Sequence, residues 1–200
     1  MTISANAVGT FDYETLENGS VKIVNYVGDD TEVTVPATLS SGEEVSAIEG
    51  AFNGNSTVKE ITISDGISTI GEYTFANCES LEHVTILSNS IEIDSTAFDN
   101  SSAVINCYSG SSAEAYAVEN NISYQILPES VTLGKTSLTL GVGETYTLKT
   151  QLTPSNASDV MTWTSSNTSV ATVDSNGKIT ANSTGVSIIR VKLANGETAS

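Results

Sequence analysis

The chain has 200 residues, of which 24 are Asp or Glu and only seven are Lys or Arg, so its formal net charge at pH 7 is −17. The whole net charge lies in residues 1–128, where Lys22 and Lys59 are the only basic residues besides His83, whereas residues 129–200 are neutral overall. Such a surface repels nucleic acid phosphates and anionic headgroups, and no run reaches the about 20 apolar residues of a membrane span, so we expect neither nucleic acid binding nor membrane insertion.

The amino-terminal residues MTISANAVGT lack the basic and apolar regions of a signal peptide. The rest of the chain is rich in Ser, Thr and Asn and poor in Lys, which is typical of an exported protein. We therefore expect a mature or trimmed segment of a longer protein, located outside a bacterial cell or on its surface, with signal peptide and anchor elsewhere.

The first predicted elements are two alternating strands at residues 21–26 and 31–35. They flank the turn residues 27–30, so we expect a hairpin that closes the amino-terminal end of the fold. Asp29, Asp30 and Glu32 in this region are a weak candidate calcium site, because calcium accepts oxygen ligands from flexible turns. The D-x-D-x-D-G spacing of a calcium loop is missing, and a solvated hairpin tip is the simpler interpretation.

A repeat of 23 residues follows. Phe52, Phe75 and Phe98 are spaced at this period, and so are Val58, Leu81 and Val104. A unit of this length cannot bury its apolar face alone, so stacked units, a solenoid, are predicted.

Each repeat contains an alternating strand with one buried and one exposed face. Ile61 and Ile63 are expected to point inward, as are Val84 and Ile86 in the next coil. The residues between them then form two outward columns, predicted as Glu32, Glu60, His83, Asn106 and as Thr34, Thr62, Thr85, Tyr108. The candidate ligand-binding residues on this sheet are Glu32, Glu60, Thr62, His83, Thr85 and Tyr108.

The two cysteines are expected to be free and buried. Cys107 takes the place of Ile61 and Val84 in the repeat, whereas Cys78 takes that of Asn55 and Ser101. A disulfide is the less favoured alternative, because the two positions lie on different parts of a coil.

A helical cap is predicted at the carboxyl-terminal end of the repeats. Ser111 and Glu114 form a capping box that opens a short helix, and Asn120 and Asn121 end it. A last strand follows at 122–126.

The second half of the sequence has the short strands and regular turns of an all-β sandwich. Strands are expected at 131–133, from Ser137, at 145–152, around Trp163, at 170–173 and at 189–193, with turns at 174–177 and at Asn195-Gly196. Trp163 is predicted to lie in the core rather than to serve as a sugar platform.

The segments GISTIGEYTFANCESLEHVTI and YSGSSAEAYAVENNISYQIL resemble the BspA-type leucine-rich repeat and its carboxyl-terminal cap, and GSVKIVNYVGDDTEVTVP is similar to the hairpin that begins such arrays. The resemblance covers about residues 13–127 and departs from the pattern at 49–50, at 90–91 and at Cys107. It implies a surface protein implicated in adhesion, without naming a ligand.

Residues 130–200 closely resemble the group 2 bacterial immunoglobulin-like domain. In that family the chain continues after Gly196-Glu-Thr-Ala-Ser into a final strand of alternating apolar residues, and here the sequence stops at Ser200. The predicted fold class is therefore mostly β: a short right-handed leucine-rich-repeat solenoid with a capping hairpin and a capping helix over 1–128, and an Ig-like β-sandwich lacking its last strand over 129–200.

Catalytic chemistry is not expected. His83 is the only histidine, and no nucleophile and orienting group accompany it; one His and two scattered Cys do not make a zinc site. Asp94 and Asp99 lie five residues apart, but a thin solenoid offers no cleft in which two carboxyl groups can face a sugar. No cofactor is predicted.

The leading hypothesis is a non-enzymatic binding or adhesion module at the bacterial surface. Its repeat sheet would recognise a host or bacterial surface protein or glycan, and the Ig-like domain would act as a spacer. The alternatives are a structural stalk and an accessory region of a larger secreted protein whose active domain lies outside this chain.

Overall fold

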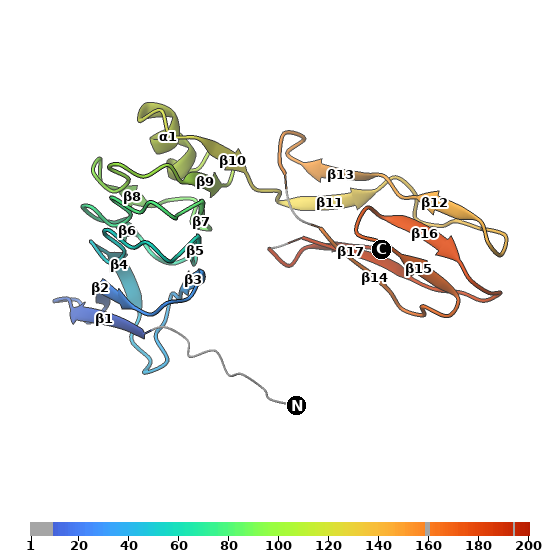
Figure 1. The fold of residues 1–200 in the computed structure, drawn as a ribbon, viewed down its shortest axis with the longest axis horizontal. Coiled ribbons are helices and arrows are strands. Elements are labelled where there is room, and N and C mark those ends of the chain that lie inside the picture. Colours follow the sequence, from blue (N-terminus) through green and yellow to red (C-terminus); the bar gives the residue numbers. More distant parts are fainter. Residues whose placement is uncertain (1–9, 159–160, 194) are drawn as a thin grey trace. The chain divides into compact units, whose positions relative to one another are not determined.

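A computed structural model describes residues 10–158, 161–193 and 195–200 (Figure 1). The contacts divide the chain into two compact units, Met1–Gln125 and Ile126–Ser200. We refer to them as the solenoid unit and the Ig-like unit.

The solenoid unit consists of stacked coils with a strand on each of two sides (Figure 1). The second apolar pair of each repeat, for which no strand was predicted, forms a second sheet. Sheet A has the order β1-β2-β4-β6-β8, with β1 Thr10–Thr15, β2 Val21–Val27, β4 Val45–Ile48, β6 Thr69–Ile70 and β8 Glu92–Ile93. Sheet B has the order β10-β9-β7-β5-β3, with β3 Glu32–Val35, β5 Glu60–Ile63, β7 His83–Ile86, β9 Val104–Cys107 and β10 Tyr124–Ile126.

The predicted amino-terminal hairpin is wrong. β2 and β3 do not pair, because 27–30 carries the chain from sheet A to sheet B: β2 pairs in parallel with β4, and β3 pairs in parallel with β5. The hairpin that closes this end is formed by β1 and β2, which pair antiparallel. β2 and β3 each bury alternate residues, so their patterns predict two strands correctly but do not show in which sheet each one lies.

The phenylalanines at the 23-residue period form the centre of the solenoid. Phe52 and Phe75 have ring centroids 5.9 Å apart, and Phe75 and Phe98 are 4.9 Å apart. Tyr26 continues the stack at one end, 5.3 Å from Phe52, and Tyr116 continues it at the other, 6.0 Å from Phe98. Phe11 of β1 lies 5.6 Å beyond Tyr26, so the column of rings built by the repeat continues into both caps.

An asparagine ladder runs beside this column on the surface. Asn77 Nδ2 donates to Asn53 Oδ1 at 3.1 Å, and Asn100 Nδ2 donates to Asn77 Oδ1 at 3.0 Å. Asn77 and Asn100 have φ of 56° and 55°, and Gly54, one coil earlier, has φ of 70°. These turns need the left-handed conformation, which Gly and Asn adopt more readily than other residues.

The carboxyl-terminal cap is the helix α1, Ser112–Glu119, as predicted. The side chain of its N-cap residue, Ser111, accepts a hydrogen bond from Glu114 N, and the helix ends at Asn120. The other half of the capping box differs, because Glu114 Oε2 accepts from Gly110 N at 2.6 Å instead of from the N-cap amide. Ala113 and Ala117 of the helix are buried, so α1 packs on the end of the stack and covers it.

Tyr26 and Tyr116, the two tyrosines of the ring column, should make the solenoid unit lose stability at high pH. Burial, with the hydrogen bond to Asp30, raises the pKa of Tyr26 from 10.0 to about 12, and burial, with the charges of Asp94 and Asp99, raises that of Tyr116 to about 12. A group whose pKa is raised by folding contributes stability that is fully present below the pKa of the unfolded state and is lost as the pH rises through that of the folded state. We expect the thermal midpoint of the solenoid unit to fall as the pH rises from 10.0 to about 12.

A double variant, Tyr26→Phe with Tyr116→Phe, should show a shallower fall in circular dichroism melts across this pH range. Tyr124→Phe, on the exposed part of β10, is the matched control and should keep the full fall. The ion pair of Lys22 with Glu49 is common to all three proteins, so it contributes equally to the fall in each of them. An unchanged slope in the double variant would show that these phenols do not control alkaline stability.

The Ig-like unit is built of short antiparallel strands in three small sheets. β11 (Ser130–Leu133) pairs with β13 (Thr150–Thr153); β16 (Lys178–Ala181) pairs with β12 (Thr145–Thr147) and β15 (Ala171–Val173); and β17 (Ile189–Lys192) pairs with β14 (Thr162–Ser165) and β18 (Thr198–Ala199). The buried centre consists of Val131, Val191 and Leu193, and Trp163 packs against it. Trp163 is only partly buried, but its predicted place against the core is confirmed.

Three predictions for this unit need correction. The run 145–152 is two strands, because β12 and β13 pair in different sheets, and the described residues 137–140 form no strand. Thr198–Ala199, for which no strand was predicted, forms β18, which pairs antiparallel with β17, with Ala199 opposite Val191. The turns at 174–177 and at Asn195-Gly196 are as predicted, with Gly177 N donating to Asp174 O at 3.0 Å and Gly196 N donating to Leu193 O at 3.0 Å.

Candidate binding surface

The outward face of sheet B brings most of the predicted residues side by side. Glu32 lies opposite Glu60, and Glu60 lies opposite His83. Thr62 likewise lies between Thr34 and Thr85 on the neighbouring strands. The residues between them, such as Ile61 and Ile63, are buried, so the alternation predicted from the sequence is present.

The predicted columns are wrong at β9. His83 lies opposite Val104, and Thr85 lies opposite Asn106, whose Nδ2 donates to Thr85 Oγ1 at 3.1 Å. The columns are therefore Glu32, Glu60, His83, Val104 and Thr34, Thr62, Thr85, Asn106. Tyr108 lies beyond the end of β9 and is not a member of either column.

The reason is a shorter turn in the last coil. Glu60 and His83 are 23 residues apart, whereas His83 and Val104 are 21 residues apart. Ala103, 2% exposed, takes the buried place that the period assigned to Val104.

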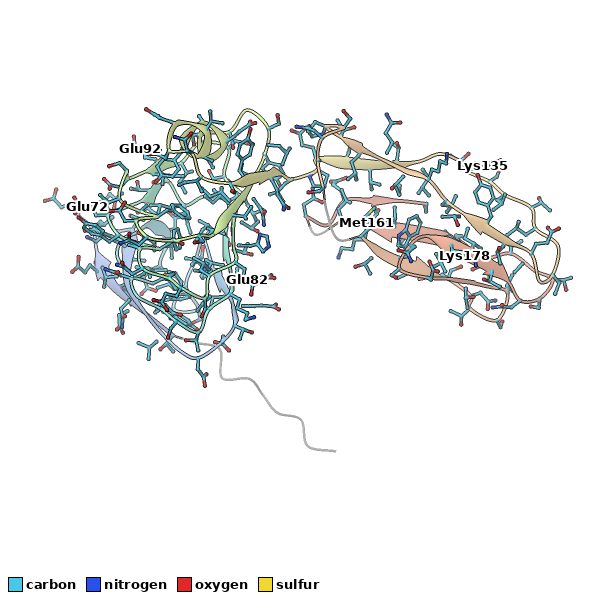
Figure 2. The ribbon with its side chains drawn as sticks, turned by 45° about the horizontal axis from the view of Figure 1, so that its top comes forward. Glu72, Glu82, Glu92, Lys135, Met161 and Lys178 are labelled. Atoms are coloured by element: carbon cyan, nitrogen blue, oxygen red, sulfur yellow. The ribbon has the colours of Figure 1, made fainter. Side chains whose placement is uncertain are left out.

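The amino-terminal part of this face carries unpaired negative charge. Glu32 and Glu60 are exposed, and neither forms a salt bridge within the described residues. The nearest cation in sequence, Lys59, pairs instead with Glu82 at 3.0 Å, with both side chains more than half exposed. Figure 2 shows Glu82 on the sheet B side of the unit and Glu72 and Glu92 on the sheet A side.

The other end of the face is neutral and contains two polar atoms without partners. His83 Nδ1 and Asn106 Oδ1 are buried, and neither has a hydrogen-bond partner among the described residues. A buried polar atom without a partner costs about 1–3 kcal/mol. This cost is absent if the two side chains turn to meet a ligand or water.

The structure does not assemble the candidate calcium site. Tyr26 Oη donates to Asp30 Oδ2 at 2.6 Å, so this carboxylate is already hydrogen-bonded to a residue of the ring column. Within the described residues no group of three or more His, Cys, Asp or Glu side chains could hold a metal ion. Asp29, Asp30 and Glu32 therefore remain separate acidic side chains at one end of sheet B.

Asp94 and the two cysteines, the remaining groups considered for chemistry, have structural environments that account for them. Asp94 Oδ1 accepts from the hydroxyl and the amide of Thr96 at 2.7 and 2.8 Å, and these bonds lower the pKa of Asp94. Cys78 and Cys107 are buried free thiols, as predicted, and burial raises the pKa of each. Thiols with a raised pKa are poor nucleophiles at neutral pH.

A cavity of about 480 Å³ lies in the Ig-like unit. Apolar side chains form much of its wall, including Leu138, Leu140, Leu148, Val186 and Ile188. Val186 is 85% exposed and Ile188 is 56% exposed, so this side of the unit is open. None of the sequence-predicted binding residues lies in it.

Comparison with known families identifies both parts of the chain. The model of the BspA type leucine rich repeat region matches residues 32–138 in six copies. The model of the bacterial Ig-like domain (group 2) matches residues 129–199. The order and identity of the two resemblances are therefore confirmed.

Curated relatives match only a part of the chain. An uncharacterized protein of Clostridium acetobutylicum is 45% identical over 73 residues, which are 36% of this chain and 7% of that protein. The lacto-N-biosidase of Bifidobacterium bifidum is 41% identical over 64 residues, which are 32% of this chain and 6% of the enzyme. The chain thus spans less than a tenth of the length of either relative.

Among solved structures, a leucine rich cell surface protein from Faecalibacterium prausnitzii is similar at 22% identity and a TM-score of 0.35, over 52% of this chain and 34% of that one. Repeat and Ig-like domains of the two matched families are non-catalytic and typical of surface or secreted proteins. No helix in the described part of the chain has the length and apolar character needed to cross a membrane. The chain belongs to the BspA-type leucine-rich-repeat family and carries a group 2 bacterial Ig-like domain, a combination that fits a cell-surface module.

Proposed function

We propose that this chain is a non-enzymatic binding module at the bacterial cell surface, in which the outward face of sheet B is the recognition surface. The observation that carries the proposal is the register of β5 and β7, which sets Glu60 beside His83 and Thr62 beside Thr85 on the outward face of the sheet. Polar side chains repeated on adjacent strands offer hydrogen-bonding groups at intervals of about 4.8 Å. Extended solenoid faces of this kind suit large, repetitive ligands.

The Ig-like unit acts in this proposal as a spacer. We propose a domain boundary between residues 128 and 129, three residues beyond the division of contacts after Gln125. The five acidic and five basic residues of the Ig-like unit leave it without net charge. Many of its exposed residues are Ser, Thr and Asn.

A second candidate is an accessory region of a larger secreted enzyme. The similarity to a segment of a lacto-N-biosidase supports it, because there a short segment like this one is part of a much longer enzyme, of which the matched residues are 6%. In this case the same two domains would position a catalytic domain that lies outside the chain. A saturable ligand of the present chain favours the first candidate.

The test is a binding screen of the full chain against glycan and matrix-protein arrays. The variant Thr62→Lys with Thr85→Lys places two long cations on the face of sheet B and leaves the inward residues unchanged. We expect binding to fall about tenfold or more, because bulky unmatched charges at an interface are strongly unfavourable.

The matched control is Ser68→Lys with Ser95→Lys, which adds the same charge at exposed positions outside sheet B. It should bind as the wild type does. Equal losses in the two variants, or no saturable ligand on any array, would contradict the proposed recognition surface.

A further inference from the structure

The chemistry of the sheet B face favours a glycan over a protein partner. The outward residues of β5 and β7 are Glu60, Thr62, His83 and Thr85, none of which is an aromatic or aliphatic anchor. Protein interfaces instead depend on buried Trp, Tyr, Arg and apolar side chains at their centre. Carboxylate, hydroxyl and amide groups are suited to the directional hydrogen bonds of sugar hydroxyls.

The charge of the solenoid then restricts the kind of glycan. Both lysines of residues 1–128 form ion pairs, Lys22 with Glu14 and Glu49, and Lys59 with Glu82. No lysine in the described part of the solenoid is left to neutralise a sulfate or carboxylate, and the net charge of this half repels anionic polymers.

The pair Glu32 and Glu60 points to a positive group on the ligand. These residues lie directly opposite each other on adjacent strands. Neighbouring strands in a sheet are about 4.8 Å apart. Like charges in this position repel and destabilise the pairing of the strands. An ammonium group between the two carboxylates would remove the repulsion and form two charge-assisted hydrogen bonds.

The strand order places this acidic pair and the neutral groups along one line. β3 and β5 carry the carboxylates, and β7 and β9 carry Thr85 and Asn106. A linear polymer that crosses the strands meets first charged and then neutral hydrogen-bonding groups. On β7 and β9, His83 Nδ1 and Asn106 Oδ1 are buried and lack partners among the described residues.

We propose, resting on the function proposed above, that the face of sheet B binds a linear amino-sugar polymer whose residues carry free ammonium groups. The carboxylates of Glu32 and Glu60 hold an ammonium group, and the threonine column with Asn106 receives the hydroxyl groups of the neighbouring sugars.

The experiment measures binding of the full chain to soluble glucosamine oligomers and to the same oligomers fully N-acetylated. We expect the glucosamine oligomers to bind and the acetylated ones to bind about tenfold more weakly or not at all. Binding should weaken as the salt concentration rises. Glu32→Gln with Glu60→Gln should weaken the binding of glucosamine oligomers roughly tenfold.

The control is Glu72→Gln with Glu92→Gln, on the sheet A side (Figure 2), which changes the net charge by the same amount. Equal losses in both double variants would show a general attraction of a polycation to an acidic protein and would overturn the proposal. Oligolysine that binds as tightly, with the same dependence on Glu32 and Glu60, would also overturn it, because the partner would then be a basic protein.

The outcomes also separate this inference from the proposed function. If glucosamine oligomers do not bind, but another ligand binds and is lost in the Thr62→Lys, Thr85→Lys variant, the recognition surface stands and the amino-sugar proposal fails. If no ligand depends on that variant, both fail.

Discussion

Phe75→Ala is expected to lower the free energy of unfolding of the solenoid unit by about 3–5 kcal/mol. Phe75 is 0% exposed and lies in the middle of the ring column, with Phe52 on one side and Phe98 on the other. Removing its ring loses apolar burial and leaves a cavity that neighbouring coils, tied by two sheets, cannot close. Because each coil is stable only through its neighbours, the loss affects the whole unit.

The two units can be followed separately in one experiment. The single tryptophan, Trp163, lies in the Ig-like unit, so its fluorescence reports that unit alone, whereas far-ultraviolet circular dichroism reports both. In urea, Phe75→Ala should move the solenoid transition seen by circular dichroism and leave the tryptophan transition unchanged. Tyr124→Ala, which alters a ring that is 39% exposed, is the control and should cost less than about 1 kcal/mol. A small effect of Phe75→Ala, similar to that of the control, would show that the ring column is not the main source of stability.

Gly177→Ala is expected to destabilise the Ig-like unit by about 2–4 kcal/mol, because two effects add. Gly177 has a φ of 74°, which residues with a Cβ adopt at a cost. A Cβ at this position would also lie 2.7 Å from Cζ2 of Trp163. The indole packs against the centre formed by Val131, Val191 and Leu193, so it cannot move without disturbing that packing.

Gly143→Ala separates these two effects. Gly143 has a φ of 87°, but a Cβ there meets no atom within 4 Å, so only the backbone cost of about 1–2 kcal/mol is expected. The tryptophan fluorescence transition in urea should therefore shift more for Gly177→Ala than for Gly143→Ala, and the emission maximum should change only in the former. Equal shifts would mean that the indole yields to the added methyl group without cost.

Much of the architecture could be predicted because it follows from local patterns. The 23-residue period of the phenylalanines predicted stacked coils, and alternation predicted which residues of β5 and β7 point outward. Ser111 predicted the start of α1, because a serine before a helical segment can accept an amide hydrogen bond. These features depend on residues close in sequence, so one chain is enough to predict them.

The wrong predictions concern features that depend on pairing between segments distant in the sequence. The sequence alone could not show that 27–30 links two sheets, or that β1 supplies the partner of β2. At β9 the constant period misplaced Val104, Asn106 and Tyr108, because a turn that is two residues shorter moved each of them along the sheet. A shift of two residues preserves the inward and outward alternation, so it leaves no trace in the hydrophobic pattern.

The sequence by itself determined the class of each domain, the buried faces and the side of the solenoid on which binding groups are exposed, because burial of apolar residues at a regular period is a local requirement. Only the tertiary structure decided which of those groups are neighbours. It set Glu32 against Glu60 and Thr85 against Asn106, and it removed Tyr108 from the column. The physical reason is that strand register is set by hydrogen bonds and turn lengths across the whole coil, and a recognition surface is defined by that register.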